Sequence, residues 1–206
     1  CEISVPKHLP SNILIEEVKK ATQVLGIQPE NLLLYNYEVR TFSYNRQAIL
    51  QDLIDLKNKI NPHLVFMPSL TDLHQDHGTI AQEALRAFKT TSILSYELPW
   101  NNLSFNTTCF ISLSEKNISS KVAALAQYES QQHRPYANDE FIRGLARTRG
   151  VQISDHYAEV FEVVQRTLCG EVLRNLVNQL ISMDINAIGI TAGDGELTRA
   201  KIANPD

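Results

Sequence analysis

Four residues that can do acid–base or metal chemistry lie close together where an apolar run gives way to a helix-like pattern. They are Asp72, His74, Asp76 and His77. Imidazole is a frequent metal ligand, and a carboxylate often orients such a ligand through its other ring nitrogen. The types of these four residues and their spacing therefore indicate a metal or acid–base site. The alternative is a plain polar loop in which Asp76 caps the next helix.

The flanking patterns place these residues at the end of a strand. The uncharged run 64–67 predicts a buried strand, and the apolar spacing in 78–88 predicts an amphipathic helix. In open α/β sheets, ligands bind beyond the carboxyl ends of the strands. Because His74 and His77 are three positions apart, their side chains can converge on one side of the first helical turn.

Composition excludes several classes of protein. The chain has 206 residues, of which 43% are hydrophobic and 20% charged, with a net charge of -4. We therefore expect a globular protein with no nucleic-acid partner. No apolar run approaches the roughly 20 residues of a membrane span. Cys1, Cys109 and Cys169 are scattered, which favours a reducing compartment and hence a cytoplasmic protein.

The elements that must position the loop follow from hydrophobic periodicity and from turn-forming residues. Helices are predicted at about 12–26, 45–60, 78–88, 115–128 and 139–149. Strands are predicted at 32–35, 64–67, 92–96, 107–113 and 157–164. This alternation predicts the α/β class, with a mostly parallel sheet and helices on both faces.

Residues 1–165 resemble the PIG-L or LmbE-like N-deacetylases. The resemblance is strongest from Pro62 to Pro68 and on to the Asp72–His77 loop, and weaker at 128–131 and 147–161. It implies a Rossmann-like fold and metal-dependent hydrolysis of an N-acetyl group on an amino sugar or sugar conjugate, a small-molecule substrate.

The resemblance also implies roles for individual residues. His77 matches the histidine that binds Zn²⁺ or another divalent metal, and His74 matches the histidine that stabilises the oxyanion. Asp76 matches the carboxylate that holds and charges His74, and Asp72 is grouped with the catalytic residues. Arg46 is a candidate for binding substrate, and its alternative is an ordinary ion pair.

One family motif, His-Pro-Asp-Asp-Glu, is not found in this sequence, although residues 1–4 resemble the segment that follows it. We therefore expect an N-terminally incomplete sheet and metal site. A catalytic zinc takes three protein ligands, so the chain alone should bind zinc weakly. The remaining histidines do not stand in contexts that replace the motif; they are His8, His63, His133 and His156. An uncovered strand edge should also promote self-association into homo-oligomers.

Residues 166–206 differ in character from the rest and form a second predicted region. A helix is predicted at 170–181, a strand at 186–190 and a glycine-bearing turn at 191–196. The segment resembles a fragment of the acetylglutamate kinases, in the amino-acid kinase family. Two alternatives to an active deacetylase therefore stay open: a catalytically incomplete binding or structural remnant, and a hybrid that contains a kinase fragment.

Overall fold

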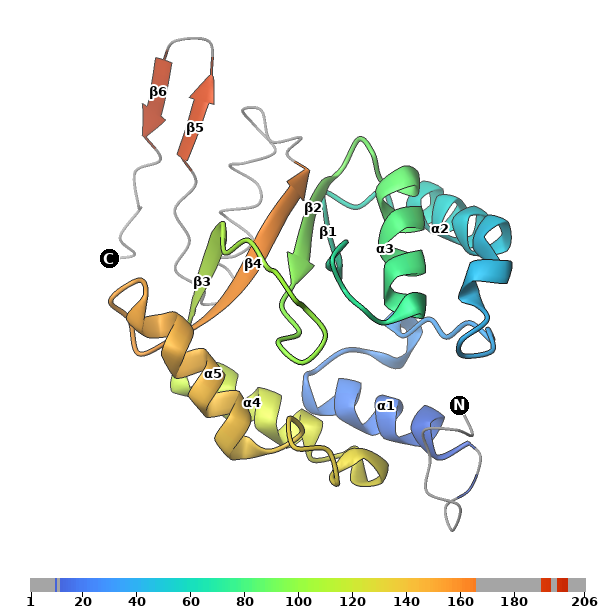
Figure 1. Cartoon of the computed structure of the whole chain (residues 1–206), viewed down its shortest axis with the longest axis horizontal. Coiled ribbons are helices and arrows are strands. Elements are labelled where there is room, and N and C mark those ends of the chain that lie inside the picture. The colour runs from blue at the N-terminus through green and yellow to red at the C-terminus, as the bar shows by residue number, and fades with distance from the viewer. Residues whose placement is uncertain (1–9, 11, 166–189, 194–195, 200–206) are drawn as a thin grey trace. The chain divides into compact units, whose positions relative to one another are not determined.

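The computed structural model describes residues 10, 12–165, 190–193 and 196–199 (Figure 1). The α-helices are α1 (Ile13–Val24), α2 (Arg46–Ile60), α3 (Gln75–Ala87), α4 (Glu115–Leu125) and α5 (Asp139–Val151). The strands are β1 (Leu64–Pro68), β2 (Ser92–Tyr96), β3 (Cys109–Leu113), β4 (Tyr157–Gln165), β5 (Ile190–Gly193) and β6 (Glu196–Arg199). Short 3₁₀ helices occupy Pro29–Asn31, Phe42–Tyr44 and Glu129–Gln131.

The α/β class is confirmed, and the main sheet is mixed. Its strand order is β1-β2-β4-β3. β1 and β2 run parallel, with Val65 opposite Ile93, because the crossover helix α3 joins them. β4 runs antiparallel to β2, with Leu94 opposite Val163, so the sheet departs from the mostly parallel arrangement that we expected.

The apolar run 32–35 was wrongly predicted as a buried strand. It has neither helical nor strand structure, and the side chains of Leu33, Leu34 and Tyr35 are exposed. A strand needs a neighbour to pair its backbone groups, and none of the strands in the described part of the chain pairs with this run. Local apolar character alone therefore did not decide its structure.

The C-terminal region is described only as a hairpin in which β5 pairs antiparallel with β6. Residues 191–193, predicted as part of a turn, belong to β5. The predicted helix at 170–181 and most of the predicted strand at 186–190 lie outside the described residues. The proposed boundary at 165/166 stays a prediction.

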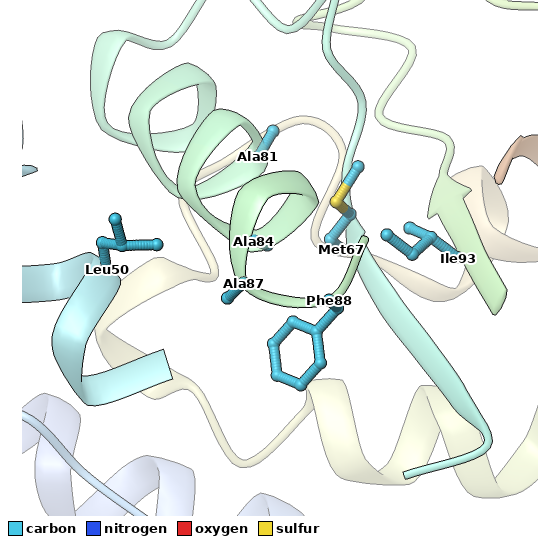
Figure 2. Packing of buried hydrophobic residues seen from close by; sticks show 7 residues of the cluster. All are labelled: Leu50, Met67, Ala81, Ala84, Ala87, Phe88 and Ile93. Atoms are coloured by element: carbon cyan, nitrogen blue, oxygen red, sulfur yellow. The ribbon is translucent and has the colours of Figure 1, made fainter. Parts of the chain in front are cut away.

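The described residues fall into two compact units, of which the second holds residues 43–111, 160–165, 190–193 and 196–199. Its core joins α2, α3, β1 and β2, and Figure 2 shows its side chains: Leu50, Met67, Ala81, Ala84, Ala87, Phe88 and Ile93. The three alanines lie on α3, where their small side chains permit close packing against β1. This packing fixes the position of the loop that joins β1 to α3.

The first unit, residues 12–42 and 112–159, packs α1, α4 and α5 with the start of β4. Its small core holds Ile118, Ala146 and Tyr157. A buried carboxylate ties α1 to the 3₁₀ turn before α5: Glu17 accepts hydrogen bonds from the Ser130 backbone N–H at 2.8 Å and from its hydroxyl at 2.6 Å. Two donors compensate the cost of burying this charge.

Two glycines of α5 give a matched test of the packing in this unit. A Cβ added at Gly150 would lie 2.7 Å from the His156 carbonyl oxygen and 2.8 Å from that of Asp155, whereas one at Gly144 meets nothing within 4 Å. Because backbone cannot yield easily, we expect Gly150→Ala to lower the free energy of unfolding by about 1–3 kcal/mol. Gly144→Ala should raise it by up to about 1 kcal/mol through helix propensity. Urea denaturation measures both, and equal effects at the two positions would contradict the described packing.

Candidate active site

The buried carboxylate of Asp72 organises the loop between β1 and α3. Its side chain is fully buried. One oxygen, Oδ1, accepts a hydrogen bond from the His74 backbone N–H at 2.7 Å. The other, Oδ2, lies 2.8 Å from Nδ1 of His77. Asp72 therefore links the end of the loop to the first turn of the helix.

The contact with Asp72 determines which ring nitrogen of His77 is available to bind a metal. An ionised carboxylate only accepts hydrogen bonds, so Nδ1 must carry the proton. In the neutral imidazole this leaves the lone pair on Nε2. The His77 side chain is 37% exposed, so Nε2 belongs to a ring that is partly accessible. This is the arrangement of a metal-ligating histidine whose second nitrogen is held by a carboxylate.

His74 is placed beside His77, as their spacing predicts. The two rings stack with centroids 4.5 Å apart. His74 is also the N-cap residue of α3, and its Nδ1 accepts from the Asp76 backbone N–H at 3.2 Å. The Asp76 side chain is buried, and its predicted role in charging His74 stays a prediction.

A second loop, which includes residues 101–104, borders the first. The backbone N–H of Leu73 donates to the Asn101 carbonyl at 3.1 Å, and Asp72 and Asn102 form an antiparallel β-bridge. Thr71 adds a hydrogen bond from its hydroxyl to the Ser104 carbonyl at 2.8 Å. These contacts hold the Asp72 backbone in place.

Tyr96 belongs to this neighbourhood and was not identified from the sequence. It ends β2 opposite Pro68, the last residue of β1. Burial, and then the negative charge of Asp72, raise the pKa of Tyr96 from 10.0 to about 12. Its position at the carboxyl end of a predicted strand was the one available signal.

Arg46 takes part in an ion pair, which was the alternative to its predicted role in binding substrate. Its Nε and Nη2 lie 2.6 Å and 2.5 Å from Oε1 of Glu83, whose side chain is fully buried. Arg86 donates to the other oxygen at 2.6 Å. Two guanidinium groups thus neutralise Glu83, which the sequence did not single out. The substrate role of Arg46 stays a prediction.

His77 and Tyr96 also line an otherwise apolar cavity of about 520 Å³. Its remaining lining comes from β1, α2, α3 and the residues that follow α2 and α3. The cavity runs up to the carboxyl ends of β1 and β2, since it includes both Pro68 and Tyr96.

The described residues do not by themselves fit a closed zinc site. A catalytic zinc takes three protein ligands, and no three His, Cys, Asp or Glu side chains in the described part of the chain are grouped so as to hold an ion. His77 offers one ligand atom. His63 is exposed just before β1, and His156 contacts Arg147. His133 is exposed, and His8 lies outside the described residues.

Comparison with known proteins connects this loop to deacetylases. Residues 7–88 match the family model described as PIG-L: GlcNAc-PI de-N-acetylase. Over 121 residues, 56% of this chain, the sequence is 32% identical to an uncharacterized deacetylase, YaiS, of Escherichia coli. The match spans 64% of that protein's length.

Solved structures share the fold at lower identity. The 4-carboxy-2-hydroxymuconate hydratase GalB of Pseudomonas putida aligns with a TM-score of 0.57 and 18% identity, over 78% of this chain and 74% of that one. The zinc-inhibited form of teicoplanin deacetylase Orf2 aligns with a TM-score of 0.55 and 16% identity, over 72% of each chain. At these identities the likeness establishes the fold. None of the helices that the structure describes could cross a membrane.

The placement of Tyr96 beside Asp72 can be tested by its titration. The difference in phenolate absorbance between the wild type and Tyr96→Phe should show one phenol with a pKa of about 12. Asp72→Asn should lower that pKa, because it removes the negative charge near the phenol. Burial of Tyr96 should still keep the pKa above 10.0.

The raised pKa of Tyr96 also predicts how the free energy of unfolding depends on pH. Between pH 10.0 and about 12 the unfolded chain loses the Tyr96 proton while the folded chain keeps it, so stability falls as pH rises. Tyr96→Phe should make that fall shallower in urea titrations. A Tyr96 phenol that titrates at its ordinary pKa would contradict the placement.

Proposed function

We propose that this chain carries part of the active site of a PIG-L-type deacetylase, which hydrolyses an N-acetyl group on an amino sugar or sugar conjugate. The observation that carries the proposal is the Asp72–His77 pair with His74 stacked beside it, at the carboxyl end of β1. This loop lies inside the segment that matches the deacetylase family model. The sugar substrate is proposed by similarity to that family.

The chemistry assigned to the loop is attack of water on the acetyl carbonyl. The C–N bond then breaks, and the products are acetate and the free amine. His74 is the proposed oxyanion donor, because its Nδ1 is occupied by the Asp76 N–H and its Nε2 is left to carry the donated proton. Asp72 keeps His77 in one orientation and one tautomer.

The proposed cofactor is zinc or another divalent ion, with Nε2 of His77 as one ligand. The family comparison and the carboxylate on Nδ1 support this assignment. The described residues do not supply the other ligands. A cytoplasmic location is likewise proposed, on the scattered cysteines of the sequence.

One observation favours a second candidate, a binding or structural remnant that keeps the fold without catalysis. It is that no three His, Cys, Asp or Glu side chains among the described residues are grouped so as to hold an ion. GalB, a hydratase, also shows that related folds serve more than one chemistry.

The test is release of acetate from an N-acetylglucosamine conjugate, with zinc added, by this chain joined to an upstream segment that supplies the His-Pro-Asp-Asp-Glu motif. Removing one preorganised oxyanion donor typically lowers turnover about 100- to 1,000-fold, and we expect this for His74→Ala. His77→Ala should also abolish most of the activity. His63→Ala is the matched control, because His63 is exposed just before the amino end of the same strand, and it should leave turnover unchanged.

The outcomes separate the two candidates. If the joined protein, without substitutions, releases no acetate while remaining folded by circular dichroism, the catalytic proposal fails and the remnant is favoured. If His74→Ala and His63→Ala have equal turnover, the loop is only a helix entrance and the roles proposed for it are wrong.

A further inference from the structure

The loop after β2 presents two large apolar side chains to solvent from a well-defined turn. Trp100 is 40% exposed and Leu103 is 83% exposed. The backbone N–H groups of Asn101 and Asn102 both donate to the Leu98 carbonyl, at 2.8 and 2.9 Å. In return, the side-chain oxygen of Asn102 accepts from the Leu98 backbone N–H at 2.6 Å. The backbone that carries Trp100 is therefore held in one conformation by the loop itself.

The same loop is fastened to the loop that carries the candidate site. Leu103 lies between Asn102, which forms the β-bridge with Asp72, and Ser104, whose carbonyl accepts a side-chain hydrogen bond from that loop. Leu73 donates its backbone N–H to the turn at 3.1 Å, and its own side chain is 62% exposed. Exposed apolar side chains from both loops thus lie next to the residues that hold His77.

The position of this loop is set by strands within the described part of the chain. β2 is an interior strand, since it pairs with β1 on one side and with β4 on the other. Its last residue, Tyr96, lies opposite Pro68 of β1 and Phe161 of β4. Ligands of open α/β sheets bind beyond the carboxyl ends of parallel strands, here β1 and β2. The loop therefore borders the place where a ligand of the candidate site would lie.

The chemistry of the loop selects an uncharged, apolar group. Residues 98–111 contain no Asp, Glu, Lys or Arg, so a charged group would find no partner of opposite charge on this segment. An exposed tryptophan offers a large, rigid apolar surface, and clustered exposed apolar side chains often mark a binding surface. Ligand sites commonly combine such apolar walls with a few polar groups that fix orientation.

We propose that Trp100 and Leu103 bind the apolar aglycone of the substrate, an alkyl or aromatic group attached to the N-acetyl sugar. The Asp72–His77 loop then acts on the acetyl group, while the loop after β2 determines which conjugates are preferred. This inference rests on the proposed function, because the aglycone and the acetyl group belong to one substrate. It names the two side chains that set specificity for the part of the substrate that does not react.

Trp100 provides its own probe, because it is the one tryptophan in the sequence. The chain is titrated with octyl and methyl β-N-acetylglucosaminide below the micelle concentration, and tryptophan emission is recorded. We expect the octyl glycoside to shift the emission to shorter wavelength and to bind at least about tenfold more tightly than the methyl glycoside. Leu103→Ala should weaken octyl binding roughly three- to tenfold, because it removes apolar contact area.

Ile60→Ala is the matched control. Ile60 is 56% exposed in the same unit, but it ends α2 just before the amino end of β1, and its substitution should leave octyl binding unchanged. The proposal is overturned if the octyl glycoside leaves Trp100 emission unchanged or binds no more tightly than the methyl glycoside. It is also overturned if Leu103→Ala and Ile60→Ala bind the octyl glycoside alike. Emission that responds to phosphatidylcholine vesicles but not to the glycoside would overturn it in favour of a lipid surface.

Hydrolysis by the chain joined to the upstream motif separates this inference from the proposed function. The octyl glycoside should have a lower KM than the methyl glycoside at similar kcat, and Trp100→Ala should remove the difference in KM. If no acetate is released while octyl binding still depends on Leu103, the proposed function fails and the apolar subsite stands. If acetate is released from both glycosides with equal KM, the apolar subsite is overturned and the proposed function stands.

Discussion

The candidate site depends on a single buried carboxylate. Asp72 is removed from water, so its charge must be compensated by donors, and an unpaired buried charge would be very costly. The His74 backbone N–H and the His77 ring meet that requirement. Because the donors are the N-cap residue of α3 and a residue of its first turn, the same two contacts fix the loop against the helix and orient the imidazole. The apolar packing of α3 against β1 holds the loop in a fixed position relative to the sheet.

The sequence revealed the loop and its neighbours because those features are local. The strand before it, the helix after it and the convergence of His74 with His77 all follow from periodicity and spacing. The side-chain contacts within the site could not be predicted in this way, because they depend on how the chain folds in three dimensions. Asp72 reaches His77 five positions away only through the bend of the loop, and Glu83 meets Arg46 across 37 positions. The run 32–35 shows the same limit, since strand formation requires a partner that periodicity cannot supply.

Strand β1 has two separate consequences for the molecule. Its carboxyl end leads into the Asp72 loop, which lies inside the segment that matches the deacetylase family model and which carries the proposed chemistry. Its outer edge is apolar and borders a cavity that reaches His77. Both features involve the same strand. The loop that follows β1 offers His77 as a metal ligand, and among the described strands β1 pairs with β2 alone.

The tautomer of His77 reports whether Asp72 organises this site. Nitrogen-15 correlation spectra of the labelled protein, at a pH where imidazole is neutral, report which ring nitrogen carries the proton. We expect protonated Nδ1 and bare Nε2 in the wild type, because Asp72 accepts from Nδ1. Asp72→Leu should shift the population toward protonated Nε2. A wild-type His77 with its proton on Nε2, unchanged in Asp72→Leu, would contradict the claim that Asp72 organises this site.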